Sequence, residues 1–192
     1  MALHRYTPMI RNPEAALPTA LPRLTLVTGG ARSGKSGFAE GLARGFGRPR
    51  RYIATAQAFD AEMQERIDHH RAQRGADWLT VEAPLDLAGA LALAQPAEVV
   101  LVDCLTLWLT NHLLAGHDLP AEVARLTAAL TACPAQVICV TNEVGWGIVP
   151  GDPLSRRFRD EQGRLNQQIA AQAGLAVLVA AGLPLVLKGA LP

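Results

Sequence analysis

The sequence has almost no lysine: among 192 residues only Lys35 and Lys188 are lysines, and arginine carries the remaining positive charge. A large excess of either charge is also missing, because the formal net charge is +1. Proteins that bind nucleic acid through its phosphates usually carry a basic surface, so we expect no nucleic-acid partner. The scarcity of lysine also makes any lysine-containing motif harder to match by chance.

Long apolar runs are missing as well. No run reaches the roughly 18 residues that a membrane-spanning helix needs, and the first residues have no apolar segment of the kind found in secretory signals. The three cysteines, Cys104, Cys133 and Cys139, are odd in number, widely spaced and set among apolar residues. This pattern predicts buried thiols in a reducing compartment. We therefore expect a cytoplasmic protein with no membrane span.

Length and composition are typical of one folded domain. A chain of 192 residues is long enough for a sizeable core, and 49% hydrophobic against 18% charged residues argues against disorder over most of it. Residues 1–23 contain several prolines and scattered charges, which predict a flexible N-terminal extension. Residues 24–192 contain no repeat or linker, so we expect a single domain there.

Strand-like and helix-like segments alternate along this domain. Predicted strands are Leu24–Thr28, Tyr52–Thr55, Leu79–Glu82, Val99–Asp103, Val137–Thr141, Ala176–Val179 and Leu185–Leu187, the last two joined by a Gly-Leu-Pro turn. Predicted helices are Ser36–Arg44, Ala61–Gln73, Leu85–Leu93, 105–115, 120–132 and Ser155–Ala173. Such alternation predicts an α/β fold with a mostly parallel sheet and helices on both faces.

A phosphate-binding loop follows the first predicted strand. The stretch Gly29-Gly30-Ala31-Arg32-Ser33-Gly34-Lys35-Ser36 matches G-x-x-x-x-G-K-[ST] between a strand and a helix, which is the context that this motif requires. Glycines let backbone N–H groups surround phosphate oxygens at a helix N-terminus. Lys35 is predicted to reach the β- and γ-phosphates and Ser36 to bind Mg²⁺. The motif predicts a P-loop NTPase-like fold and a nucleotide site.

A second metal ligand should end a buried strand. Asp103 follows four apolar residues, as the acidic residue that binds Mg²⁺ does in P-loop proteins. An aspartate that caps the following helix has the same appearance in a sequence. Together with the phosphate loop, the pattern favours the metal role for Asp103.

The class of nucleotide enzyme is narrowed by two missing motifs. A regulatory GTPase has an Asn-Lys-x-Asp guanine-reading motif and an Asp-x-x-Gly switch, whereas this chain has TNEV at 141–144 and DCLT at 103–106. A small-molecule kinase is the remaining default interpretation. A nucleotide-binding regulator without transfer chemistry is an alternative that these absences disfavour.

Four stretches carry a resemblance to a known family: VTGGARSGKS, YIATAQAFDAEMQERIDHHR, TNEVGWGIVP and SRRFRDEQGRLNQQIA. Together they resemble the bifunctional adenosylcobinamide kinase/adenosylcobinamide-phosphate guanylyltransferase family of cobalamin biosynthesis, over about residues 24–188. The resemblance implies phosphorylation of the aminopropanol hydroxyl of adenosylcobinamide by ATP or GTP. It further implies transfer of GMP from GTP, through a guanylyl-histidine, to give adenosylcobinamide-GDP. The alternative is a P-loop kinase of another small hydroxyl compound that lacks guanylyl transfer.

The resemblance also implies site residues and partners. It assigns the guanylylated nucleophile to His69 and, beside the phosphate loop, places these residues around GTP: Thr55, Ala56, Gln57, His70, Arg71, Ala72, Gln73, Glu82 and Asp103. Adenosylcobinamide and its phosphate are the implied partners, GTP and ATP the nucleotide substrates, and Mg²⁺ the cofactor. Members of the family are oligomers, commonly trimers, so a homo-oligomer is expected.

The histidine pair admits other interpretations when its residues are considered alone. Helix geometry places Arg66 within reach of either His69 or His70, and so does not choose between them. A neutral imidazole, with a pKa of about 6.5, can attack an α-phosphorus, but a solvated basic helix face or a metal site would also contain such residues. Adjacent histidines serve a metal poorly, and the resemblance favours the nucleophile.

Two later stretches are less specific. TNEVGWGIVP follows a strand and therefore lies at the ligand-binding edge of an α/β sheet, where Trp146 would cover the corrinoid or a base, or pack in a tight loop. Arg157, Asp160 and Arg164 share one face of the last helix. That face is either a solvated set of ion pairs or a phosphate- or subunit-facing surface.

Overall fold

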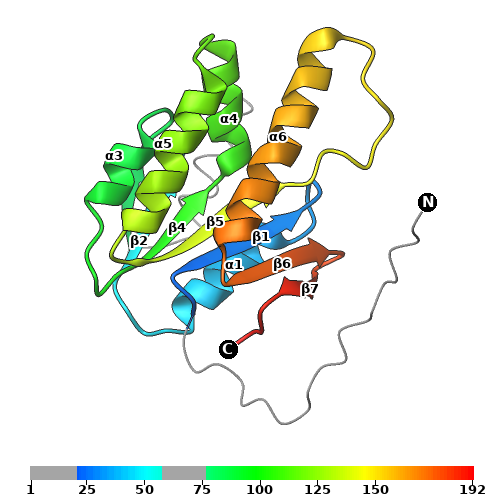
Figure 1. Cartoon of the computed structure of the whole chain (residues 1–192). Helices are drawn as coiled ribbons and strands as arrows, with labels where there is room; N and C mark the ends of the chain where they lie inside the picture. Colours follow the sequence, from blue (N-terminus) through cyan, green and yellow to red (C-terminus); the bar gives the residue numbers. More distant parts are fainter. Residues whose placement is uncertain (1–20, 58–76) are drawn as a thin grey trace, which may run out of the picture.

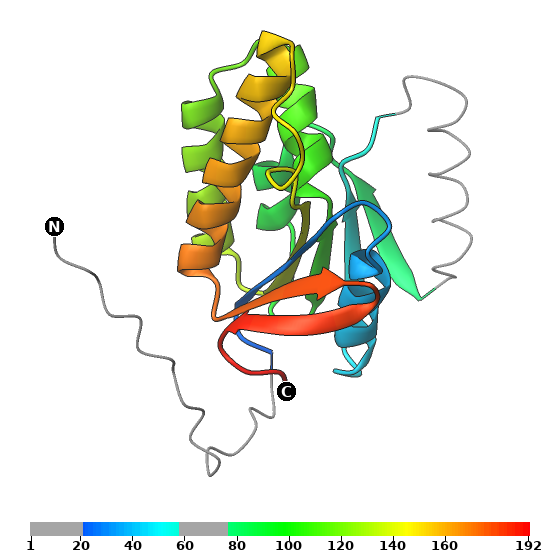
Figure 2. The ribbon, with the colours of Figure 1, turned by 90° about the vertical axis from the view of Figure 1, so that its right-hand side faces the viewer.

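A computed structural model of the chain describes residues 21–57 and 77–192 (Figure 1). Their strands form one seven-stranded sheet in the order β3–β2–β4–β5–β1–β6–β7, in which only the β6–β7 pairing is antiparallel. The β6–β7 hairpin lies at one edge of the sheet (Figure 2). The prediction of a mostly parallel sheet is confirmed. The strands are β1 Leu24–Gly29, β2 Arg50–Ala54, β3 Trp78–Glu82, β4 Val99–Asp103, β5 Gln136–Asn142, β6 Leu175–Ala180 and β7 Leu183–Lys188.

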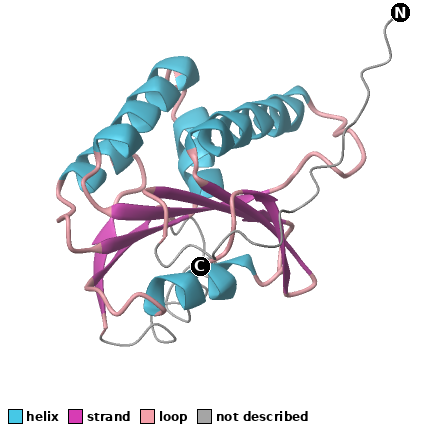
Figure 3. Cartoon of the chain, turned by 60° about the horizontal axis from the view of Figure 1, so that its bottom comes forward, coloured by secondary structure: helices cyan, strands magenta, loops and turns pink. Residues whose placement is uncertain are grey.

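Helices cover both faces of the sheet, as predicted (Figure 3). One face, which we call the α1 face, packs Val27, Leu101 and Val140 against α1. The opposite face, which we call the four-helix face, packs Leu26, Val102 and Cys139 against the other helices. The helices are α1 Lys35–Arg44, α3 Leu87–Ala92, α4 Leu105–Leu114, α5 Leu119–Ala132 and α6 Pro153–Gln172. Alternate residues of each central strand therefore face two separate cores.

The turn between the last two strands differs from the prediction. Ala181 and Gly182, both with positive φ (52° and 79°), form a two-residue turn, and Leu183 and Pro184 already belong to β7. Positive φ at both central positions gives the backbone twist that a tight hairpin needs. Pro184 is tolerated because β7 is an edge strand. The predicted Gly-Leu-Pro turn is therefore wrong by about two residues.

Two predictions concern segments at the limits of the described residues. The helix predicted over Ala61–Gln73 lies outside them, as do residues 1–20 of the expected N-terminal extension. Leu21 is buried, and Gln136 Nε2 donates to its carbonyl over 2.5 Å. The packed part of the chain thus includes residues that precede the expected boundary at 23.

A buried ion pair lies where β2 and β4 begin, at the amino edge of the sheet. Arg51 Nε donates to Glu98 Oε2 over 2.9 Å and Arg51 Nη2 to Oε1 over 3.1 Å, while the Gln95 N–H donates to Oε2. Burial by itself raises the pKa of Glu98, but the hydrogen bonds from Arg51 and Gln95 outweigh it and the net pKa is lowered. Each charge is therefore neutralised inside the protein.

A pair of histidines lies at the end of α4. His112 Nε2 is 3.1 Å from the Leu85 carbonyl oxygen and its Nδ1 is 2.9 Å from His117 Nδ1, while its ring packs on Trp108. Because a carbonyl only accepts, Nε2 of His112 carries a proton, and in the neutral pair His117 Nδ1 donates to His112 Nδ1. Burial lowers the pKa of His112, so the folded protein favours the neutral ring.

The three cysteines are buried free thiols, as predicted. Burial raises the pKa of Cys104 to about 11 and that of Cys139 to about 12, and it raises the pKa of Cys133 as well. Thiols in this state are poor nucleophiles at neutral pH. In the described part of the chain, no helix combines the length and the apolar character required to cross a bilayer.

Candidate functional site

The phosphate loop joins β1 to α1 and has the tight geometry that its glycines allow. Gly34 has φ of 91°, a conformation that glycine adopts without strain, and a Cβ there would lie 3.2 Å from Gly182 Cα. The N–H of Gly182 donates to the Ser33 carbonyl over 2.9 Å, so the β6–β7 turn supports the loop. Lys35 Nζ donates to the Gly30 carbonyl over 3.2 Å. The side chain of Lys35 thus folds back along its own loop.

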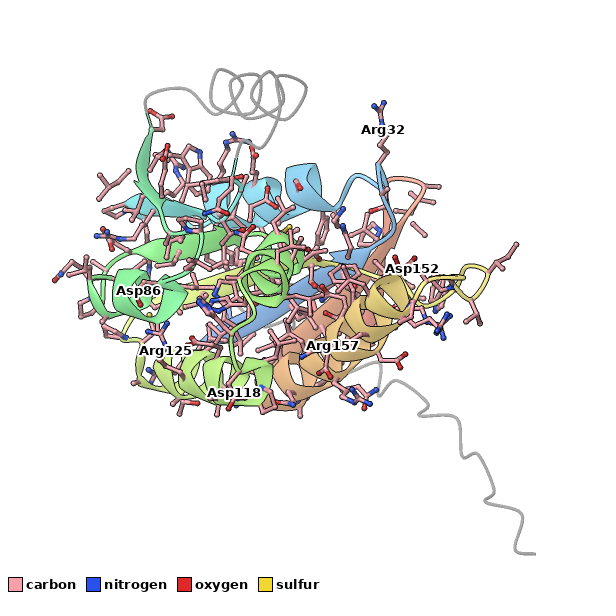
Figure 4. The ribbon with its side chains drawn as sticks, turned by 90° about the horizontal axis from the view of Figure 1, so that it is seen from above. Arg32, Asp86, Asp118, Arg125, Asp152 and Arg157 are labelled. Carbon is pink, nitrogen blue, oxygen red and sulfur yellow. The ribbon has the colours of Figure 1, made fainter. Side chains whose placement is uncertain are left out.

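Arg32 is an exposed residue of the loop, and Figure 4 shows its side chain pointing away from the body of the protein. Its φ of 55° is unusual for a residue with a Cβ. The next residue, Ser33, has a buried Oγ without a hydrogen-bond partner among the described residues. The loop therefore contains one charge in solvent and one enclosed hydroxyl that no described group satisfies.

Asp103 ends β4 on the α1 face, the side on which the loop continues into α1. Tyr52, whose ring belongs to the core of that face, donates its hydroxyl to Asp103 Oδ2 over 2.8 Å, and the Asp103–Cys104 peptide bond is cis. Strand β5 separates β4 from β1. Across the described residues neither Lys35 nor Asp103 has an ion-pair partner, although both are partly enclosed. The predicted loop and the predicted acid therefore lie at the same edge of the sheet.

The end of β2 also lies at this edge. The Thr55 N–H donates to the Asp103 carbonyl over 3.2 Å, and the buried Thr55 hydroxyl donates to the Cys104 carbonyl and accepts from the Cys104 N–H. Ala56 and Gln57 follow and are half-buried. The Thr55 hydroxyl is thus used to fix the backbone beside Asp103, which its residue type alone did not reveal.

Glu82 ends β3, the strand at the far side of β2 from β4. It pairs in register with Ala54 and its side chain is exposed. Glu82 also lines an open groove of about 400 Å³ with Val81, Pro84, Leu85 and Leu93. The structure therefore places this predicted residue at the same edge as Asp103, two strands away.

The remaining predicted residues lie outside the described part of the chain. These are the proposed nucleophile His69 and its neighbours His70, Arg71, Ala72 and Gln73. Their roles in binding GTP and transferring GMP therefore stay predictions.

A polar network beside the site was missed in the sequence. Gln162, fully buried in α6, donates through Nε2 to Thr141 Oγ1 and Asn166 Oδ1, both at 2.9 Å. Asn166 Nδ2 donates to the Asn142 carbonyl, and the Asn142 N–H donates to Thr106 Oγ1 over 2.7 Å. The network ties β5, α4 and α6 together where β5 reaches the site. Of these residues only Asn166 lies in the amide-rich run NQQ of the sequence, and nothing in the sequence marks Gln162.

Comparisons with known proteins identify the family. A model of the family described as cobinamide kinase / cobinamide phosphate guanyltransferase matches residues 25–187. The bifunctional adenosylcobalamin biosynthesis protein CobP of Pseudomonas aeruginosa PAO1 is 50% identical over 85% of this chain and 96% of that protein. CobU of Escherichia coli K12 is 46% identical over 86% of this chain and 99% of that protein. The chain belongs to the cobinamide kinase / cobinamide phosphate guanyltransferase family.

Solved structures agree on the fold. The RadB recombinase aligns with a TM-score of 0.50 at 18% identity, covering 82% of this chain and 74% of that one. The type III secretion ATPase EscN aligns with a TM-score of 0.51 at 12% identity, covering 82% of this chain and 43% of that one. At such identities only the fold is shared, and it confirms the predicted P-loop NTPase-like class.

In this family member the TNEVGWGIVP stretch leaves β5 as an exposed apolar arm. We call residues 143–151 the apolar arm; Trp146, Ile148 and Val149 are 77%, 97% and 58% exposed. The arm begins at the phosphate loop, because the Glu143 N–H donates to the Gly29 carbonyl over 3.1 Å. It ends at α6, where Asp152 caps the helix by accepting from the Ser155 N–H (Figure 4). Trp146 therefore does not pack in a tight loop, which was one of the two predictions for it.

The charged face of α6 is arranged differently from its sequence spacing. Arg164 pairs with Glu161 over 2.7 Å, and Arg159 approaches Asp160 at 3.8 Å. Arg157 is exposed. These are surface contacts, which contribute little to stability.

Proposed function

We propose that this chain catalyses two successive reactions on one corrinoid. In the first, the aminopropanol hydroxyl of adenosylcobinamide attacks the γ-phosphorus of ATP or GTP; the nucleoside diphosphate leaves and the hydroxyl proton is released. In the second, GMP is transferred from GTP to the new phosphate to give adenosylcobinamide-GDP and pyrophosphate. The observation that carries the proposal is the family match over residues 25–187 on a chain whose phosphate loop and Asp103 lie at the same sheet edge.

The phosphate loop, Gly29–Ser36, would hold the nucleotide in the first reaction. Backbone N–H groups of the loop and of the α1 N-terminus would surround the phosphates, where the helix dipole favours negative charge. Among the described residues, Lys35 Nζ donates a hydrogen bond to the neutral Gly30 carbonyl. A charged phosphate oxygen can replace this carbonyl as its partner. Such contacts position the γ-phosphate and offset the charge that develops during its transfer.

The residues present fit a magnesium ion. Asp103 and Ser36 both offer oxygen donors, which Mg²⁺ prefers, and the hydrogen bond from Tyr52 orients the Asp103 carboxylate. Ser36 lies in the first turn of α1, the helix that covers the face of the sheet on which Asp103 lies. When bound, Mg²⁺ would neutralise charge on the β- and γ-phosphates.

The second reaction would use His69 as a nucleophile. Its neutral imidazole would attack the α-phosphorus of GTP, pyrophosphate would leave, and a phosphate oxygen of the corrinoid would then displace the histidine. Thr55, Ala56, Gln57, Glu82 and residues 70–73 are proposed to surround this GTP. A carboxylate such as Glu82 can accept hydrogen bonds from a ribose or from the edge of guanine.

The apolar arm offers a surface for the acceptor. Adenosylcobinamide contains a broad, flat corrin ring and must bring one hydroxyl to the γ-phosphate. The arm starts at the phosphate loop and exposes Trp146 and Ile148 to solvent, and aromatic side chains pack well on flat ligands. We propose that the macrocycle lies on this arm.

We also propose that the protein acts as a cytoplasmic homo-oligomer, with a trimer as the first state to test, and binds no nucleic acid. Three leucines on one side of β7, Leu183, Leu185 and Leu187, are 71%, 58% and 57% exposed. Apolar stripes of this kind on an edge strand favour association. Light scattering of the purified chain measures its oligomeric state directly.

Labelling with α-labelled GTP tests the two-step proposal. The wild-type chain should acquire GMP label that is lost in acid and kept in base, as a phosphoramidate requires. His69→Ala should lose this label and guanylyl transfer but keep part of its adenosylcobinamide phosphorylation, because phosphoryl transfer to a hydroxyl needs no protein nucleophile.

His70→Ala is the matched control. It should keep the label at reduced yield, since adjacent helical residues diverge by about 100° and only one can face the phosphorus. Label that persists in His69→Ala overturns the assignment. Loss in His70→Ala alone moves the nucleophile by one residue, and a wild-type chain that neither phosphorylates adenosylcobinamide nor takes up label refutes the proposed function.

A further inference from the structure

Asn142, the last residue of β5, lies between the two parts of the candidate site. It pairs in register with Gly29, the first residue of the phosphate loop. On its other side β5 pairs with β4, where Asp103 lies opposite Val140. Asn142 is therefore two residues beyond the level of Asp103, in the strand that separates the loop from the carboxylate.

The side chain of Asn142 faces the same side of the sheet as Asp103. Ile138 and Val140 pack in the core of the α1 face, whereas Thr141 faces the other way and bonds to residues of α6. Successive side chains of a strand alternate between faces, so Asn142 returns to the α1 face. That is the side on which Lys35 and Ser36 begin α1.

The backbone of Asn142 is fixed while its amide is unpaired. Thr106 Oγ1 accepts its N–H over 2.7 Å and Asn166 Nδ2 donates to its carbonyl over 3.0 Å. Its side-chain Oδ1 is buried without a partner, and in the described part of the chain the amide makes no hydrogen bond. Leaving a buried amide oxygen unpaired is unfavourable. Asn142 therefore combines a fixed backbone with a side-chain amide that can hydrogen-bond to a ligand.

We propose that Asn142 contacts the γ-phosphate of the bound nucleotide, donating a side-chain N–H to one of its oxygens. The inference rests on the proposed kinase step and adds a residue to it. Only Oδ1 of the amide is enclosed, so Nδ2 is the atom that can donate to a ligand. A neutral donor fixed beside the transferred group stabilises the charge that develops on it. Thr106 and Asn166 act through Asn142 and are positioning residues.

Adenine nucleotides test the inference without interference from guanylyl transfer. The affinities of β,γ-imido-ATP and of ADP, both with Mg²⁺, are measured for the wild-type chain and for Asn142→Ala by calorimetry. The variant should bind the triphosphate at least about tenfold more weakly, the size of one hydrogen bond to a charged group, while ADP affinity changes less than twofold. Phosphorylation of adenosylcobinamide by ATP should fall about 10²–10³-fold in kcat. Asn142→Asp, which adds negative charge, should lose more triphosphate affinity than Asn142→Ala.

Gln136 provides a matched control, because it is the amide at the opposite end of the same strand. Its Nε2 donates to the Leu21 carbonyl and its Oε1 is buried without a partner among the described residues. Gln136→Ala should lower the urea midpoint yet leave the ratio of triphosphate to ADP affinity unchanged. Equal losses for both nucleotides in Asn142→Ala, or no loss for either, overturn the inference.

Thr106 tests the positioning role. Thr106→Ala removes the acceptor of the Asn142 N–H and should shift the same affinity ratio in the same direction, whereas Thr106→Ser should restore it. The inference and the proposed function can fail separately. If Asn142→Ala loses triphosphate affinity selectively but the wild-type chain phosphorylates no adenosylcobinamide, the inference is supported and the proposed function is refuted.

Discussion

The two edges of the sheet treat charge in opposite ways. At the amino edge, Arg51 and Glu98 are buried together and neutralise one another through two hydrogen bonds. At the carboxyl edge, Lys35 is bonded to a carbonyl and Asp103 to a phenol, so each charge is held by a neutral group. The ionic partner of a buried charge stabilises the fold only because it offsets the cost of removing that charge from water. A charge that is held by neutral groups is available to a ligand of opposite sign.

The comparison separates residues that we expect to serve the fold from residues that we propose to serve binding. An ionic partner inside the protein competes with any ligand, whereas a neutral partner is exchanged easily. The amino edge should therefore respond to substitution with lost stability and the carboxyl edge with lost activity.

The largest effect is expected when this rule is applied to the two lysines. Lys35→Ala should lower kcat/KM for γ-phosphate transfer by about 10²–10³-fold, because one fixed donor to the transferred group is lost, and should leave the urea midpoint unchanged. Both quantities are measured on the same purified protein.

Lys188 supplies the control, since it is the other lysine of the chain. Its Nζ donates to the Ala170 and Ala171 carbonyls near the end of α6. Lys188→Ala should cost about 0.3–1 kcal/mol of stability and leave transfer unchanged within twofold. If Lys35→Ala keeps most of its rate, the assignment of the phosphate loop is wrong.

The amino edge should behave in the reverse way. Glu98→Ala leaves the Arg51 charge buried without its partner and should lower the free energy of unfolding by about 3–5 kcal/mol. Activity per folded molecule should be unchanged. Denaturant unfolding and a kinase assay on the folded fraction check the two parts.

The double variant Arg51→Met/Glu98→Leu sharpens this test. It removes both charges and should recover most of the lost stability. A double variant as unstable as the single one would mean that packing, not the unpaired charge, causes the loss.

The histidine pair should give the smallest effect. Because burial lowers the pKa of His112 from its ordinary 6.5, the unfolded chain binds more protons than the folded one between the two values. The contribution of neutral His112 to the free energy of unfolding is fully present above about pH 6.5. It declines as the pH falls toward the lowered pKa of the folded state, by at most about 1.4 kcal/mol per pH unit. Unfolding free energies of wild type and His112→Gln, measured from pH 5 to 8, should differ in this slope. Parallel profiles would contradict the assignment.

Much of the fold was accessible from the sequence because apolar periodicity is a local signal. Val99–Asp103 was predicted with its observed bounds, and a buried strand of five residues between polar segments leaves few alternatives. The motif of the phosphate loop was equally clear, since all of its residues are close together in the sequence. The turn at Ala181–Gly182 was misplaced because Pro184 suggested that the turn included it, whereas an edge strand accommodates a proline.

The polar contacts of the site were less accessible. Thr106, Thr141 and Gln162 come from three segments that meet only in the folded sheet, and none has a residue type that marks it as special. The same holds for Arg51 and Glu98, whose pairing depends on the position of β2 beside β4. Long-range register decides which polar groups become partners, and no local pattern encodes it.

The sheet order has a consequence for synthesis. The strand that carries the phosphate loop, β1, is the first described strand to leave the ribosome, yet both of its neighbours, β5 and β6, are made more than a hundred residues later. A nascent chain therefore holds an apolar strand that cannot be paired until most of the protein exists. Closing such long loops slows folding, and the unpaired edge is open to aggregation while it waits. The segment that we propose to bind the nucleotide is thus made early and completed late.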